Sequence, residues 1–172
     1  MDKKLTIAII IILFSGLMNY NIPSNKIKKR ISRAKIGYNY IEKKEKPIGN
    51  IIIPKIKVNN DLYDIKSPNN DVDKNVALLY KNNHIIVLAA HSGTGKAAYF
   101  KNLNQLNIND EIIINLDNNK NKYIVKNIWE EEKNGTINFK EEYDNQLVLT
   151  TCSPTNKEKQ LIVSCIIKEH IF

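Results

Sequence analysis

Short runs of apolar, often β-branched residues recur along most of this chain, separated by polar turns. Runs of this length and composition are typical of strands rather than of buried helices. The turns between them are rich in Asn and Asp, as at residues 59–61, 69–71 and 117–119, and these residues favour tight turns. The pattern predicts eight strands, at about residues 48–57, 61–65, 75–80, 84–90, 110–116, 121–129, 146–152 and 160–168.

Two other segments have a helical pattern. Within residues 96–106, Phe100, Leu103 and Leu106 are spaced by threes and form a narrow apolar stripe that would pack on a sheet. A second helix is predicted around residues 25–40. Eight short strands with one or two short helices predict a mainly β domain, folded as a closed or nearly closed barrel.

The N-terminus has a different character, because residues 5–20 are almost entirely apolar. Sixteen helical residues span about 24 Å, somewhat less than the roughly 30 Å core of a bilayer. Lys3 and Lys4 precede the run as in a signal peptide, but no Ala-x-Ala-like cleavage site follows it. We therefore predict an uncleaved membrane anchor at residues 1–20, with a cleaved secretion signal as the alternative.

Charge divides the remainder of the chain into two parts. Of the formal net charge of +8, residues 21–46 carry +7, from nine basic and two acidic residues. Residues 47–172 hold 15 basic and 15 acidic residues, so the predicted barrel is neutral and unlike a nucleic-acid-binding domain. We predict a basic stalk or helix at 21–46, close to anionic lipid head groups. By the positive-inside rule alone, this stretch favours a cytoplasmic C-terminal domain.

Two apolar runs end in chemically reactive side chains. Cys152 closes the run 147–152, and His91 closes the run 85–91, so each lies where a strand leaves the core. A cysteine and a histidine that meet in space can act as nucleophile and proton carrier. Taken alone, a cysteine at the end of a strand is more often structural. The pair nevertheless makes His91 and Cys152 the candidate catalytic residues.

The turn after Cys152 predicts the register of the last hairpin. If its centre lies near Asn156, Cys152 faces Gln160 and Cys165 faces Leu147. The two cysteines are then separated by about 17 Å along the ladder, too far for a disulfide. Cys165 is better interpreted as a small core residue.

The remaining histidines and motifs provide weaker evidence for a functional site. His84 and His170 lie outside the apolar runs, and we expect them to be exposed and without a catalytic role. No cluster of cysteine, histidine and acidic residues has the spacing of a metal site, so no metal is predicted. The segment 92–96 (SGTGK) is similar to the end of a P-loop, but it lacks the leading glycine and has Ala97 in place of Ser or Thr. We therefore predict no cofactor.

Several motifs together resemble the sortases, the cysteine transpeptidases of Gram-positive cell surfaces. The histidine motif is LAAHSG at residues 88–93, and the cysteine motif is VLTTC at 148–152, with Val148 in place of the usual threonine. The strand at 48–56, the segment 99–103 and residues 109–111 also resemble sortase elements in the same order. The similarity covers about residues 47–170, and it implies a sortase-like eight-stranded barrel in residues 47–172.

The resemblance also implies a site and a reaction. Cys152 would attack an LPxTG-like sorting signal of an exported protein, and the thioester would pass to an amine of a peptidoglycan precursor or a pilin. His91 would transfer protons. The long connection at 130–146 would border the substrate groove; a solvated acidic loop is the alternative. The domain would be extracellular, on a single-pass anchor in the cell membrane.

One position departs from the sortase pattern. The usual catalytic arginine is replaced by Gln160, and the only arginines of the chain are Arg30 and Arg33. We predict that the Gln160 amide serves as a weaker donor to the oxyanion, with Lys157 and Lys159 as other candidate cations. The alternative is an inactive surface module that binds sorting peptides; an unrelated cysteine peptidase fits the order of strands less well.

Overall fold

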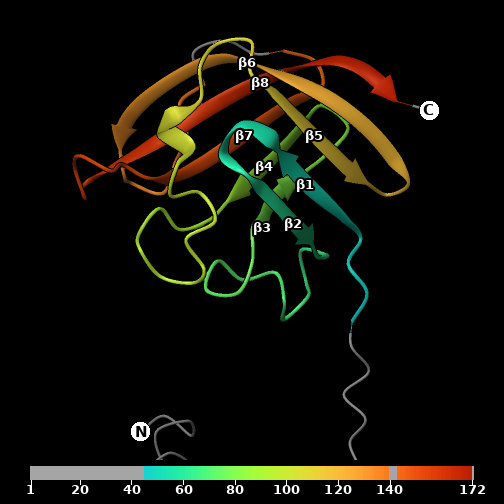
Figure 1. Ribbon diagram of the computed structural model, residues 1–172, viewed down its shortest axis with the longest axis horizontal. Helices are drawn as coiled ribbons and strands as arrows, with labels where there is room; N and C mark the ends of the chain where they lie inside the picture. Colours follow the sequence, from blue (N-terminus) through green and yellow to red (C-terminus); the bar gives the residue numbers. More distant parts are fainter. Residues whose placement is uncertain (1–44, 140–142, 172) are drawn as a thin grey trace, which may run out of the picture. The chain divides into compact units, whose positions relative to one another are not determined.

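Eight strands form, as predicted, and they join into one sheet that curves into a nearly closed barrel (Figure 1). The second strand covers residues 58–62 rather than the predicted 61–65, so the turn predicted at 59–61 is wrong. The strands are β1 (Gly49–Ile53), β2 (Val58–Leu62), β3 (Ala77–Lys81), β4 (Ile85–Ala89), β5 (Glu111–Leu116), β6 (Asn119–Glu132), β7 (Gln146–Cys152) and β8 (Lys159–Ile171). Their order in the sheet is β2-β1-β5-β6-β8-β7-β4-β3. The predicted fold class, a mainly β barrel of eight strands, is therefore confirmed between β1 and β8.

The computed structural model describes residues 45–139 and 143–171. The predicted anchor at 1–20, the predicted helix at 25–40 and almost all of the predicted stalk lie outside the described residues. Within the described part of the chain, no helix is both long enough and apolar enough to cross a membrane.

The predicted helix at 96–106 is wrong. The segment instead makes successive turns that close with bonds between residues three apart, and only η2 (Leu103–Gln105) is helical, as a short 3₁₀ turn. Phe100, Leu103 and Leu106 are all buried, as the prediction required. Their spacing of exactly three residues matches a 3₁₀ turn, in which side chains three apart lie above one another, better than an α-helix. The other short helix, η1 (Pro54–Ile56), begins where Pro54 ends β1.

The centre of the sheet is covered on both faces. Leu147 and Leu149 of β7 point into the main core, where they are fully buried. Val148, between them, points to the opposite face and joins a second cluster. That cluster consists of Val87, Trp129, Val148 and Ile162, with Ile85 and Ile137 packed against it. Burial on both faces explains why residues 147–149 of β7 are consecutive apolar residues in the sequence.

Two long strands, β6 and β8, arch across the barrel side by side (Figure 1). Their ladder continues to Glu131 opposite Gln160 and Glu132 opposite Lys159. The predicted strand ended at 129, because glutamate has a low preference for strands. This extension means that the connection to β7 begins at Lys133, directly beside the turn between β7 and β8.

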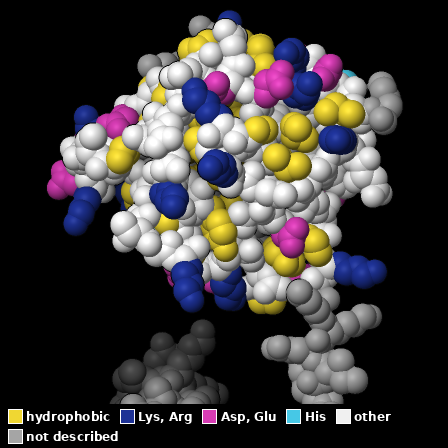
Figure 2. Space-filling model, in the orientation of Figure 1, with side chains coloured by type: hydrophobic (Ala, Val, Ile, Leu, Met, Phe, Trp, Pro, Cys, Tyr) yellow, Lys and Arg dark blue, Asp and Glu magenta, His cyan; other side chains and the backbone are white. Residues whose placement is uncertain are grey.

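Charge is distributed evenly on the barrel. In the view of Figure 2, lysine side chains are spread over the face rather than gathered in one patch. Several are paired with carboxylates, such as Lys122 with Glu169 and Lys168 with Glu111. This distribution agrees with the neutral formal charge of residues 47–172.

Candidate active site

The parallel pairing of β4 and β7 brings His91 and Cys152 to the same end of the sheet. The two strands are aligned so that Ala89 lies opposite Thr150. Beyond that pair, the buried Thr151 hydroxyl donates a 2.7 Å hydrogen bond to the carbonyl oxygen of Ala90. Because both strands run in the same direction, the next residue of each chain segment leaves the sheet at the same edge. Two residues that are far apart in the sequence therefore lie at the same end of the sheet.

A cavity of about 240 Å³ lies at this end of the strands. Its lining contains all three predicted site residues, His91, Cys152 and Gln160. The remaining lining residues are Val72, Leu79, Ala89, Ala90, Lys133, Thr150 and Thr151. Cys152 is half-buried and His91 is exposed, so a ligand in this cavity would contact both side chains.

His91 is held by a residue that the sequence did not reveal. Its Nε2 atom lies 2.8 Å from Oδ1 of Asp73, in the loop between β2 and β3. A carboxylate only accepts hydrogen bonds, so the proton of the ring is on Nε2 in this arrangement. The backbone is fixed as well, because Phe100 N–H donates to the carbonyl oxygen of His91 at 3.0 Å. The pair is open to solvent, since the side chain of Asp73 is 79% exposed.

Cys152 has a lysine beside its sulfur. The Nζ atom of Lys133 lies 3.2 Å from the Sγ atom of Cys152, within hydrogen-bonding distance. Lys157 and Lys159, the cations expected here, do not line the cavity, and their contribution stays a prediction. Lys133 could not be predicted from the sequence, since its position depends on the extra length of β6.

Gln160 lies directly opposite Cys152 in the β7–β8 ladder, and the predicted hairpin register is confirmed. Its amide nitrogen donates to Oε1 of Glu131 at 3.0 Å and to the carbonyl oxygen of Thr136 at 2.5 Å. An amide nitrogen has only two hydrogens, so both are engaged. In this arrangement Gln160 ties the loop after β6 to the barrel, and its role as an oxyanion donor stays a prediction.

The second cysteine, Cys165, is buried in the core, where its thiol is unreactive. Cys165 is fully buried opposite Leu147, as predicted, and both cysteines are free. Burial raises the pKa of the Cys165 thiol far above its ordinary value, because the core disfavours the charged thiolate. Of the two thiols, only that of Cys152 is accessible and next to a cation.

The remaining histidines lie away from this site. His84 and His170 are both exposed, as predicted. His84 lies 3.5 Å from Asp144, and His170 hydrogen-bonds Asn121. No three metal-ligating side chains come together in the described residues.

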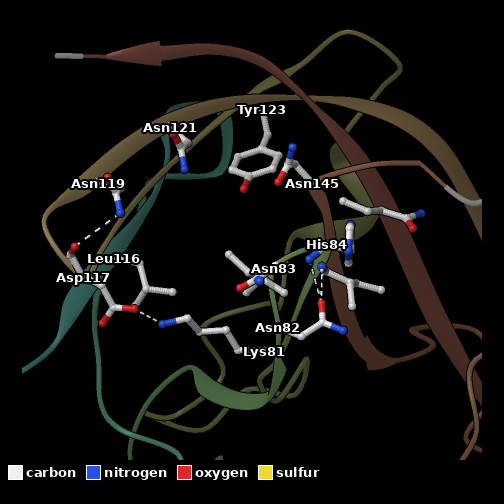
Figure 3. A pocket seen from close by; sticks show the side chains of 13 residues that line it. Lys81, Asn82, Asn83, His84, Leu116, Asp117, Asn119, Asn121, Tyr123 and Asn145 are labelled. Carbon is white, nitrogen blue, oxygen red and sulfur yellow. Dashed lines mark hydrogen bonds and ion pairs between the residues drawn. The ribbon is translucent and has the colours of Figure 1, made fainter.

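A different cavity, of about 180 Å³, lies at the opposite end of β4 and β7 (Figure 3). Several amide side chains line it, with an ion pair between Lys81 and Asp117 on one side. His84 and Gln146, which line it, stand at the starts of the strands that end near His91 and Cys152. Its lining includes no thiol, so it lacks the nucleophile of the first cavity.

Comparison with known proteins gives one consistent family. The profile of the sortase domain matches residues 51–167. Among solved structures, sortase C of Streptococcus pneumoniae is 23% identical with a TM-score of 0.60, over 71% of this chain and 66% of that one. Sortase A of Corynebacterium diphtheriae is 24% identical with a TM-score of 0.62, over 74% of this chain and 64% of that one.

Sortase C of Clostridium perfringens, solved with the C-terminal cell wall sorting motif, is 22% identical with a TM-score of 0.60, over 72% of this chain and 71% of that one. At these identities the structural matches establish the fold. The chain spans slightly less than two thirds of the first two structures. No curated protein matches the chain in sequence.

Proposed function

Because the chain belongs to the sortase family, we propose that it is a cysteine transpeptidase with Cys152 as nucleophile and His91 as proton carrier. The observation that carries this proposal is the single cavity that both residues line at the shared end of β4 and β7. The ladder and the Thr151–Ala90 hydrogen bond fix the backbone on both sides of that cavity.

The reaction has two halves. The Cys152 thiolate attacks the carbonyl carbon of a peptide bond, and the tetrahedral intermediate collapses to a thioester as the C–N bond breaks. His91 gives its proton to the departing amine. An amine acceptor then attacks the thioester, passes a proton to His91, and the C–S bond breaks to release the new amide and the Cys152 thiolate.

The cavity also fits the expected kind of substrate. One side is formed by apolar groups, among them Val72, Leu79 and Ala89, and Leu79 is about half exposed. An apolar side chain of an extended peptide would cover these groups, and the peptide bond to be cleaved would lie over Cys152. The Clostridium perfringens sortase C, whose structure includes a cell wall sorting motif, supports a substrate of this class.

We further propose that the substrate is an exported protein with an LPxTG-like signal, and that the acceptor is an amine of a peptidoglycan precursor or a pilin. The apolar run at 5–20 supports a single-pass anchor. Membership of the sortase family supports an extracellular domain, whereas the basic stretch at 21–46 favours the opposite orientation by the positive-inside rule. Protease treatment of intact cells tests this orientation: the barrel is removed if it is outside and protected if it is cytoplasmic.

The second candidate is a sortase-like module that binds sorting peptides without cleaving them. The substitution of the usual arginine by Gln160 favours it. The two functions separate in one experiment, in which the purified full chain is incubated with a panel of sorting-signal peptides and an amine acceptor. Cleavage with formation of the amine-joined product supports the transpeptidase; binding without cleavage supports the module.

A further inference from the structure

The barrel lacks an arginine that could stabilise negative charge at its proposed nucleophile, Cys152. Residues 45–172 contain no arginine, since Arg30 and Arg33 are the only two in the chain. A thiolate and the oxyanion that follows it both require positive charge or strong donors nearby. Apart from His91, the cavity contains one cationic side chain, Lys133.

Lys133 is placed to supply this charge. Its ammonium lies 3.2 Å from the Cys152 sulfur. Among the described residues, no carboxylate lies within ion-pair distance of it, although three glutamates precede it in the sequence. Within this part of the chain, therefore, no acid neutralises its charge, and its ammonium hydrogen-bonds the Cys152 sulfur.

The backbone around Lys133 is anchored to the barrel at several points. Lys133 N–H donates to the carbonyl oxygen of Glu158 at 2.8 Å. The Thr136 carbonyl accepts from Gln160, and Glu131 accepts from both the backbone and side-chain nitrogens of Asn138. Ile137 packs on the outer apolar cluster that includes Trp129. These contacts hold the Lys133 backbone beside the turn that follows Cys152.

We propose that Lys133 is a catalytic residue that replaces the missing arginine, and that Gln160 is the positioning residue that holds its loop. The Lys133 ammonium keeps its proton throughout and donates a hydrogen bond, first to the Cys152 thiolate and then to the oxyanion. The oxyanion is only two bonds from the sulfur, so a small movement of the lysine serves both. This inference rests on the proposed role of Cys152 as nucleophile.

The test uses the full chain and needs no peptide substrate. We compare Lys133→Met, which removes the charge at similar length, with Lys133→Arg, which keeps it, and with Lys157→Met as a control. The readout is the rate of Cys152 alkylation by iodoacetamide, an uncharged reagent, at pH 7. Two charges about 3 Å apart interact appreciably even through water, so Lys133→Met should slow alkylation about tenfold. Lys133→Arg should stay within about threefold of wild type, and Lys157→Met should have no effect.

A second comparison separates charge from structure. Residue 160 faces Cys152, so an arginine there should restore the lost charge. Lys133→Met with Gln160→Arg should therefore recover most of the wild-type alkylation rate. Gln160→Ala should slow the reaction when Lys133 is present and have little further effect in Lys133→Met, since residues that act as a unit are not additive.

The outcomes also separate this inference from the proposed function. Wild-type alkylation rates in Lys133→Met, together with unchanged peptide turnover, would overturn the role of Lys133 and leave the transpeptidase intact. Slow alkylation in Lys133→Met without peptide turnover by wild type would support the lysine–thiolate pair and contradict the transpeptidase. Failure of Gln160→Arg to rescue a folded Lys133→Met protein would refute the replacement of the arginine.

Discussion

Replacing Thr151 with valine tests how the site is held together. The Thr151 hydroxyl is buried and donates to the carbonyl oxygen of Ala90. Thr151 directly precedes Cys152, and Ala90 directly precedes His91. Valine has nearly the same shape, so Thr151→Val removes the donor without opening a cavity. The Ala90 oxygen would then be buried without this partner.

The expected magnitude follows from that loss. Leaving a buried acceptor unsatisfied costs about 1–3 kcal/mol, so the free energy of unfolding should fall by this amount. The loss also loosens the backbone next to His91, and small displacements of catalytic groups are costly. We expect the specificity constant of peptide transfer to fall roughly tenfold.

Urea unfolding and peptide turnover measure the two effects separately. Thr151→Ser keeps the hydroxyl and should restore much of both quantities. A lower midpoint with an unchanged denaturant slope identifies a change of stability rather than of the unfolded state. If Thr151→Val unfolds at the wild-type urea concentration, the hydrogen bond does not stabilise this end of the strands.

We predict the effects of substitutions at three further positions. Gly49→Ala would push a Cβ into the backbone of β5, whereas Gly93→Ala meets open space, so only the first should lower the unfolding midpoint substantially. The pKa of Cys165 is raised by burial, so the folded state keeps a proton that the unfolded chain releases above about pH 8.5. Stability should therefore fall as the pH rises beyond that point, by up to about 1.4 kcal/mol per unit; Cys165→Ala should flatten this dependence, and equal slopes would contradict the explanation. The Asp73–His91 pair is exposed and is worth at most about 1 kcal/mol, so Asp73→Asn should change turnover less than about fivefold, whereas His91→Asn should reduce it at least 100-fold. A larger loss in Asp73→Asn would show that Asp73 is part of the machinery.

Local pattern was sufficient to predict much of the barrel. Apolar runs located the strands other than β2, and counting outward from Asn156 placed Cys152 opposite Gln160. The polar centre of β2 (VNNDL) was instead taken for a turn. The helix at 96–106 failed because three buried residues spaced by threes fit a 3₁₀ turn as well as a helix. The ends of β6 and β8 were missed because pairing with a neighbouring strand, rather than intrinsic preference, extends them.

The site was predicted only in part, for a related reason. His91 and Cys152 end strands, so the pattern of the strands located them. Asp73 and Lys133 lie on loops, whose paths depend on tertiary contacts such as the Gln160–Thr136 hydrogen bond. The absence of arginine from the barrel was the one sign in the sequence that another cation is required.

The role of Cys152 as nucleophile is tested most directly by the mass of the enzyme during turnover. The full chain is mixed with a sorting-signal peptide without an amine acceptor, quenched in acid and digested. We predict an added acyl group on the peptide that contains Cys152, held by a bond that hydroxylamine cleaves, and its disappearance when an amine acceptor is supplied. Peptide cleavage without this adduct, or an adduct that persists in Cys152→Ala, would contradict Cys152 as the nucleophile.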